Sequence, residues 1–229
     1  MLYDLHIHSC LSPCADDNMT PCMIAGMAKL AGADVISIAD HNSARNLPAA
    51  QLCCNAYGIK LLPCIEVNTA EEIHMLCYFP TVKAALAMSD MLYDGLASFE
   101  YDGNIWGKQL IVNEDDEIEG TLDKLLTSAS ALNIYETKAY AEGLGGIAVP
   151  AHAEKDSYSL LSVLGFCPSD LDFECIEMRN PCKYEALAQK QFLPANKPII
   201  TSSDAHCIDN IACCMQELDA QNPLMRLLK

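Results

Sequence analysis

Residues 2–8 read LYDLHIH, a short run in which polar side chains stand at every second position. This period of two is typical of a β-strand, whose successive side chains point to opposite faces. His6 and His8 therefore share one face of the predicted strand, and both imidazoles can reach one metal ion. Whether the pair is a metal site or an accident of composition depends on the rest of the chain.

The residues after this strand alternate between predicted helices and predicted strands. Thr20 and Pro21 are typical of a helix start, with Thr20 as the N-cap. The uninterrupted apolar run 34–39 (DVISIA) indicates a strand buried on both faces. The other elements predicted here are a helix over about 44–56 and strands over 60–67 and 73–79. This succession predicts βαβ units and a parallel sheet.

The middle of the chain departs from this alternation of helices and strands. Helices are predicted over 81–99 and 121–145, and between them the acidic run NEDDEIEG (113–120) is interpreted as a solvated turn. We expect 81–145 to be an insertion or an elaborated crossover within a single domain that spans 1–229. The strand pattern returns in the segments GIAVPAH (146–152), FECIEMRN (173–180) and KPIITSSDAH (197–206).

Composition narrows the classes of function. The chain has 229 residues, of which 51% are hydrophobic and 20% charged, so a substantial core can form. Its formal net charge of −17, with no cluster of Lys and Arg, predicts no long nucleic acid and no membrane surface as a partner. A small phosphorylated substrate remains compatible with this charge if bound metal cations offset it locally.

Location is predicted from the cysteines and from the absence of targeting patterns. Neither an apolar run of membrane-spanning length nor a signal-peptide pattern is visible. The 13 cysteines are odd in number and include no CxxC pair, which favours mostly reduced, buried thiols in a cytoplasmic protein.

The histidines share one kind of position. Each lies within a predicted strand or just beyond one; they are His6, His8, His41, His74, His152 and His206. Three acidic residues, Asp40, Glu66 and Asp204, accompany them. In a closed parallel barrel the carboxyl ends of the strands converge on one face, so these residues would meet. Imidazole and carboxylate ligands suit Zn, Mn or Fe, and the two oxygens of Glu66 could bridge two ions.

Two further assignments stay open at this point. Asp40 is either the N-cap of the following helix or a residue that supports a metal ligand. Cys10 and Cys14 flank the first loop and could bind metal, although burial explains most cysteines.

Six motifs occur in an order that resembles one family. They are DLHIHSCLSP, SIADHN, CIEVNT, EEIHMLCYF, VPAHAEK and SSDAH, and they span residues 4–206. This order is similar to that of the PHP (polymerase and histidinol phosphatase) family of metal-dependent phosphoesterases. The resemblance implies an α/β fold, a distorted, TIM-like (β/α)7 barrel with an inserted segment, and up to three divalent ions (Zn, Mn or Fe) at the strand ends.

The resemblance also implies three ligand sets. The first comprises His6, His8, Glu66 and Asp204; the second comprises Glu66 as a bridge with His74 and His152; the third comprises Asp16, His41 and His206. The first loop is longer than is usual in the family and must be aligned from its Thr-Pro end, so Asp17 is the alternative to Asp16. The family often has AHP where this chain has AHA (151–153).

The implied activity is hydrolysis of a phosphoric ester by a metal-activated water. Glu66 and His74 would act at the reacting centre, and Lys155 and Arg179 would hold the phosphate. Candidate substrates are nucleotide monophosphates or bisphosphates, sugar phosphates and histidinol phosphate. Two alternatives remain: an amidohydrolase-type enzyme that cleaves C–N or C–O bonds, and a metal-binding regulatory domain without turnover.

Overall fold

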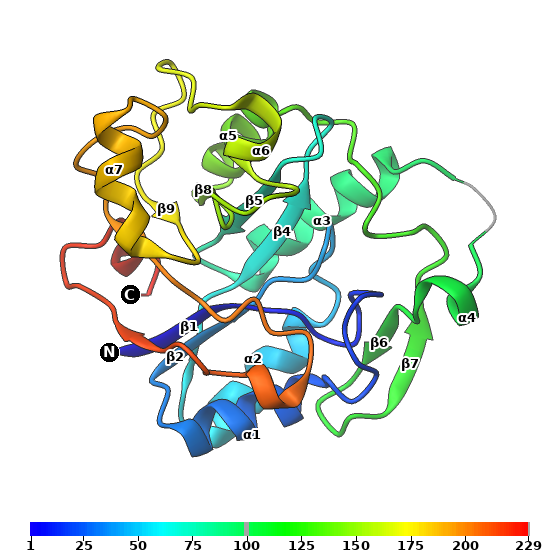
Figure 1. The fold of residues 1–229 in the computed structure, drawn as a ribbon. Helices are drawn as coiled ribbons and strands as arrows, with labels where there is room; N and C mark the ends of the chain where they lie inside the picture. Colours follow the sequence, from blue (N-terminus) through cyan, green and yellow to red (C-terminus); the bar gives the residue numbers. More distant parts are fainter. Residues whose placement is uncertain (99–100, 229) are drawn as a thin grey trace.

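The first third of the chain forms a parallel sheet with two helices beside it (Figure 1). The computed structural model describes residues 1–98 and 101–228. Strands β1 (Leu2–Ile7), β2 (Val35–Ile38) and β3 (Lys60–Leu61) pair in parallel, and β11 (Gln216–Glu217) adds an antiparallel edge to β1. Helices α1 (Pro21–Ala31) and α2 (Leu47–Tyr57) pack on each other and connect these strands. The predicted βαβ units are therefore confirmed here.

Local signals explain these elements. The Thr20 hydroxyl accepts a hydrogen bond from the Met23 amide, Pro21 is the first helical residue, and Gly32 ends α1 with a left-handed φ of 91°. Every residue of β2 is buried, as its continuous apolar run predicts.

A second sheet contradicts the expectation of one parallel sheet. Strands β4 (Cys64–Asn68), β5 (His74–Tyr78) and β8 (Ile147–Pro150) are antiparallel. The connection 69–73 is a tight turn, closed by a 3.0 Å hydrogen bond from the Thr69 amide to the Ile73 carbonyl. Parallel neighbours need a crossover of roughly a dozen residues or more, which this segment is too short to supply.

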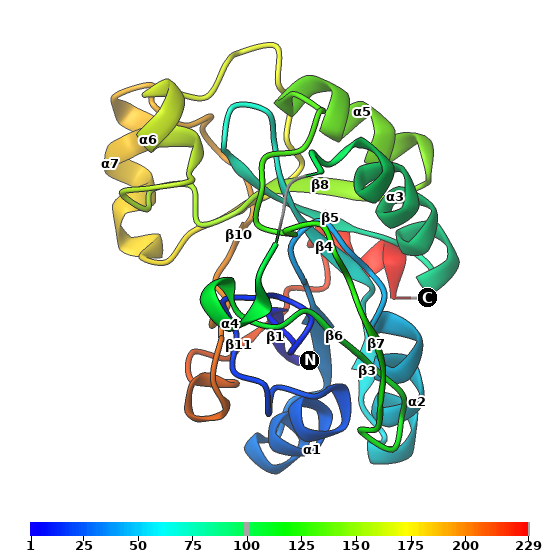
Figure 2. The same ribbon diagram turned by 90° about the vertical axis from the view of Figure 1, so that its right-hand side faces the viewer.

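In its described residues, the segment 81–145 forms three helices and a hairpin. They are α3 (Val82–Gly95), α4 (Gly103–Trp106), β6 (Leu110–Val112), β7 (Ile118–Thr121) and α5 (Ile134–Gly143). α3 and α5 pack on the second sheet (Figure 2). The prediction of a helix over 81–99 holds for Val82–Gly95, and its last residue lies outside the described residues.

The predicted helix over 121–145 is shorter than expected. It begins only at Ile134, because a capping box between Asn133 and Glu136 starts the helix there, while 118–121 pair as a strand. The acidic run 113–120 includes the exposed turn between β6 and β7, where the Asn113 amide donates to the Glu117 carbonyl, so its interpretation as a solvated turn is confirmed.

The last third of the chain supplies short elements. They are α6 (Leu160–Leu164), β9 (Ile176–Glu177), the 3-10 helix η1 (Pro181–Lys183), α7 (Tyr184–Gln189), β10 (Ile199–Ile200), η2 (Ile208–Asn210) and η3 (Pro223–Leu227). β9 and β10 are parallel. In the part of the chain that the structure describes, no helix combines the length and the apolar character that crossing a membrane requires.

The sheets meet end to end at one place. Single backbone bridges join Ile7 to Ala205 and His41 to Glu66, and the Ala153 amide donates to the Glu177 carbonyl at 2.9 Å. Over residues 1–98 and 101–228 the strands form four separate sheets, and none of them closes into a barrel by continuous pairing. The architecture is a mixed α/β fold, and these bridges bring the ends of its strands together.

One cysteine pair departs from the expectation of reduced thiols. Cys22 of α1 and Cys53 of α2 form a disulfide. Eleven cysteines are free, and five of those are buried: Cys10, Cys54, Cys64, Cys77 and Cys175.

Candidate metal centre

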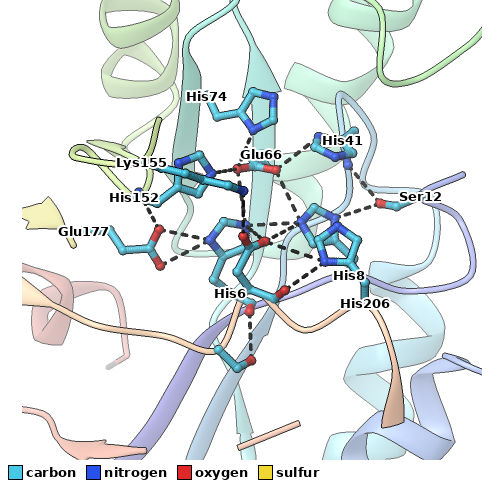
Figure 3. Close-up of polar contacts among 12 residues, drawn as sticks. His6, His8, Ser12, His41, Glu66, His74, His152, Lys155, Glu177 and His206 are labelled. Carbon is cyan, nitrogen blue, oxygen red and sulfur yellow. Dashed lines mark hydrogen bonds and ion pairs between the residues drawn. The ribbon is translucent and has the colours of Figure 1, made fainter. Parts of the chain in front are cut away.

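The strand ends bring all six histidines into one cluster (Figure 3). His6 lies on β1, His8 directly after it, and His74 at the start of β5. The other three follow strand ends: His41 comes after β2, His152 after β8 and His206 after β10. The side chains of His6, His8, His41 and His152 are buried, whereas those of His74 and His206 are 12% and 31% exposed. The sequence expectation that residues far apart in the chain would meet is confirmed.

Glu66 stands at the centre of this cluster. Its carboxylate is 1% exposed and lies within 3.0–3.3 Å of nitrogens from five of the imidazoles. Oε1 faces His6, His74 and His152, whereas Oε2 faces His8 and His41. Each oxygen therefore faces its own set of nitrogens, which is the arrangement that a bridging carboxylate needs.

Asp204 closes the cluster on the opposite side. Its Oδ1 lies 3.5 Å from Nε2 of both His6 and His8. Asp204 and His152 adopt positive φ angles, 52° and 30°. Residues other than glycine seldom occupy this region, and each costs of order 1 kcal/mol or more unless the surrounding structure holds it.

Charge is concentrated in the cluster. Burial opposes ionisation of Glu66, but His74, His6 and His41 hold its pKa well below the usual range. Burial lowers the pKa of His8, yet hydrogen bonds to Asp204 and Glu66 raise it to about 9. Two histidines behave in the opposite way.

Burial lowers the pKa of His206 to about 4, and that of His41 falls well below its ordinary value for the same reason. Without metal, protons on some imidazoles therefore compensate the buried carboxylates, a role that a divalent cation can take over.

Further residues hold the ligands in place. Glu177 accepts a hydrogen bond from Nδ1 of His6, 3.0 Å from Oε2, and another from the His152 amide at 2.9 Å. Sequence reasoning missed Glu177, although it ends a predicted strand as the other acids do. A carboxylate behind a ligating imidazole fixes its tautomer and orientation.

Asp40 supports the first loop and does not cap α2, whose N-cap is Asn46. The Asp40 carboxylate accepts hydrogen bonds from Ser9 and from the Ser12 hydroxyl, and Ser12 in turn lies 3.0 Å from Nδ1 of His8. Of the two alternatives for Asp40, the structure thus supports the indirect contact to a ligand.

Three predicted residues do not join the cluster. The side chains of Asp16 and Asp17 are exposed, and Asp17 pairs instead with Lys108. Arg179 is also exposed; its backbone amide donates to Glu154. Lys155 does reach the cluster, with Nζ 3.2 Å from Oδ2 of Asp204.

The residues fit divalent metal ions. Three groups of possible ligands have their donor atoms within 4.8 Å of one another: His6, His8 and Glu66; His41, Glu66 and His74; and His8, Cys14, His41 and His206. Oε1 of Glu66 and Nδ1 of His74 are buried in the cluster and make no hydrogen bond, although they lie 3.0 Å apart. Convergent imidazoles and carboxylates are the ligands that Zn, Mn and Fe prefer.

Solved structures share this fold. The lesion-specific endonuclease PfuEndoQ from Pyrococcus furiosus is 20% identical, with a TM-score of 0.62 over 91% of this chain and 49% of that chain. An amidohydrolase from Chromobacterium violaceum, with bound sulfate and no metal, is 19% identical, with a TM-score of 0.65 over 99% of this chain and 95% of that one. A protein from Bifidobacterium adolescentis, assigned as a metal-dependent phosphoesterase, is 16% identical, with a TM-score of 0.60 over 99% and 94%.

At these identities the likeness shows a common fold. Neither a protein-family model nor a curated protein matches the chain. The fold neighbours include Endonuclease Q and the protein assigned as a metal-dependent phosphoesterase. This chain spans about half the length of the two Endonuclease Q chains.

The prediction that long nucleic acid is not a partner of this chain was wrong. Endonuclease Q, which matches 91% of this chain with a TM-score of 0.60 and 20% identity, was solved with a 27-mer duplex substrate that carries an abasic lesion at the active site. The exclusion relied on the formal net charge of −17, which describes the whole surface. A metal centre can hold a phosphate locally whatever the total charge is, so net charge does not decide this point.

Proposed function

We propose that this chain is a metal-dependent hydrolase of phosphoric esters. The observation that carries the proposal is the Glu66 carboxylate, buried between five imidazoles with its two oxygens facing different nitrogens. The ligand sets follow the sequence motifs: His6, His8, Glu66 and Asp204 for one ion, and Glu66, His74 and His152 for a second. Divalent ions bound there would supply an acidified water and stabilise the charge on a phosphoryl group.

The residues around the ions have separate tasks. Glu177 holds His6 and the backbone at His152, so that the ligand geometry is prepared before substrate arrives. The His74 ring stacks on Tyr158, with ring centroids 5.0 Å apart, which fixes its orientation. Lys155 is 31% exposed at the edge of the cluster and can donate to a phosphate oxygen while its partner Asp204 holds it in position. We assign phosphate binding to Lys155, because Arg179 has only backbone contacts near the site.

The fold supports the same assignment. Seven strands follow one another around the cluster, in the order β1, β2, β4, β5, β8, β9 and β10, through ladders or single backbone bonds. We infer that this ring is the distorted (β/α)7 barrel that the motifs imply, with 81–145 as its elaborated crossover.

Phosphate release from a panel of substrates tests the proposal. The panel contains nucleoside monophosphates, 3′,5′-bisphosphates, sugar phosphates, histidinol phosphate and, scored by strand cleavage, a duplex with an abasic site. Protein loaded with Mn or Zn should hydrolyse one class, and a chelator should abolish the activity. His8→Ala and Glu66→Ala should remove it while the fold persists, as circular dichroism would show.

A matched pair of lysines tests the phosphate contact. Lys155→Met should lower kcat/KM by about a hundredfold, the usual cost of removing a donor to a developing charge. Lys83→Met, at an exposed position on α3, should leave it unchanged. Absence of turnover on the whole panel with metals bound would refute the proposal and favour C–N hydrolysis or a regulatory metal domain.

A further inference from the structure

The loop between β1 and α1 places a cysteine at the cluster. The Sγ atom of Cys14 and one ring nitrogen each of His8, His41 and His206 all lie within 4.8 Å of one another. The rings of His8 and His206 are stacked with centroids 4.2 Å apart, and those of His8 and His41 are 4.6 Å apart. Four donor atoms therefore converge at the end of the cluster for which the motifs predicted Asp16 as a ligand.

His41 and His206 offer ring nitrogens to a metal at this end of the cluster. Nδ1 of His206 contacts the Asp204 carbonyl at 2.8 Å, which leaves its Nε2 for a metal, whereas Nε2 of His8 already lies 3.3 Å from Oε2 of Glu66 and 3.5 Å from Oδ1 of Asp204. His41 is 5% exposed, and its Nδ1 makes no hydrogen bond, although it lies 3.1 Å from Oε2 of Glu66. A buried imidazole in this condition is a second indication, independent of the cysteine, that an ion belongs here.

Asp16 cannot make the same contact in this loop conformation. Its side chain is exposed, and its recorded contact to the cluster is through the backbone, where its amide donates to the His206 carbonyl at 2.9 Å. Asp17 is held away by its ion pair with Lys108. The carboxylates on which the resemblance relied thus point away from the cluster, whereas the thiol of Cys14, itself an exposed residue, lies within 4.8 Å of three ring nitrogens.

The loop is held in this conformation from both sides. On the inner side, Asp40 accepts hydrogen bonds from Ser9 and Ser12. On the outer side, Gly107 from the segment 81–145 packs so closely that a Cβ there would lie 1.8 Å from the carbonyl oxygen of Pro13. Pro13 directly precedes Cys14, so the position of the thiol is set by two distant parts of the chain.

We propose that Cys14 is the sulfur ligand of a third metal ion, together with His41 and His206, in the place that the motifs give to Asp16. The inference rests on the metal centre of the proposed function. A thiolate beside two imidazoles favours zinc or iron over manganese, since soft sulfur ligands select the softer ions. This end of the cluster should therefore differ in metal preference from the end around Glu66.

The test reads the sulfur ligand directly. Wild-type protein loaded with Co²⁺ should show the near-ultraviolet charge-transfer absorption of a thiolate–cobalt bond, and Cys14→Ser should lose it together with one bound ion per chain. Cys14→Asp should regain the ion but not the absorption. Cys182→Ser, at an exposed free cysteine, is the matched control and should keep both.

A second measurement needs no substitution. Zinc should slow alkylation of Cys14 in the wild-type protein by at least about tenfold, as mapped by peptide mass spectrometry, because a coordinated thiolate is a blocked nucleophile. Alkylation of Cys182 should not change. Equal reactivity of Cys14 with and without zinc, or an unchanged cobalt spectrum in Cys14→Ser, would overturn the assignment.

Each of the two proposals can be refuted without refuting the other. Metal-dependent phosphate release together with an unprotected Cys14 would overturn the sulfur ligand and leave the proposed function intact. A protected Cys14 with no turnover on any phosphoester would support the sulfur ligand and overturn the proposed function.

Discussion

Replacing Glu177 by glutamine tests how far the cluster depends on a residue that contacts its ligands from behind. The glutamine keeps the size of the side chain and removes its charge. Oε2 of Glu177 lies 3.0 Å from Nδ1 of His6 and 2.9 Å from the His152 amide, and Oε1 lies 3.2 Å from Nδ1 of His6. One amide oxygen can still accept both hydrogen bonds, but the amide NH₂ group then faces the N–H of His6.

The magnitude follows from these two hydrogen bonds. A hydrogen bond to a charged group is worth roughly 1.5–3 kcal/mol and a neutral one about 0.5–1.5 kcal/mol, so making both hydrogen bonds neutral costs about 2–3 kcal/mol. At about 1.4 kcal/mol per factor of ten, metal affinity should fall by a factor of about 30 to 140. Phosphate release at limiting metal should fall with it.

Competition against a chromophoric chelator measures the affinity, and far-ultraviolet circular dichroism verifies the fold. Glu174→Gln is the matched control. It lies three positions earlier in the same segment and pairs with Arg226 at the surface, where an ion pair contributes little. If Glu177→Gln bound metal within a factor of about two of the wild type, Glu177 would not orient the ligands and the reasoning would be refuted.

Three other predictions concern the frame of the site. The disulfide between Cys22 and Cys53 closes a loop with a sequence separation of 31, so a reductant should lower the free energy of unfolding in urea by about 3–4 kcal/mol. The reductant should have no further effect on the stability of the Cys22→Ala variant. If the reductant left the stability of the wild-type protein unchanged, the pairing would be contradicted. Gly107→Ala should destabilise the protein by about 1–3 kcal/mol and weaken metal binding, because the φ of 94° at Gly107 and its contact with the first loop leave no room for a Cβ. Gly120 has open space around it, so Gly120→Ala is the control and should change neither property. The pKa of His8 in the metal-free protein is about 9, since burial is outweighed by nearby carboxylates, so binding metal at pH 7 must displace its proton. Affinity should then rise about tenfold per pH unit between pH 7 and 9 for each proton displaced, and calorimetry in two buffers of different ionisation enthalpy would detect a failure to release protons.

Much of the fold follows from short-range patterns. The period of two in 2–8, the helix start at Thr20 and the continuous apolar run 34–39 each depend on a few neighbouring residues, and all three appear in the structure. The antiparallel second sheet was also foreseeable, because 69–73 is too short for a parallel crossover. The helix expected over 121–145 forms only from Ile134, because the capping box at Asn133 starts it there and Thr121 pairs with Leu110 of β6.

The sequence by itself determined which residue types gather at the strand ends, since alternation along a strand and the turn that follows it are local properties. All six histidines, Glu66 and Asp204 are identified in this way. The tertiary structure alone decided which side chain of the first loop faces them. The thiol of Cys14 lies beside the histidines and the carboxylate of Asp16 does not, because Asp40 and Gly107 hold the loop from opposite sides. These contacts join residues separated by many tens of positions, and no local pattern records them.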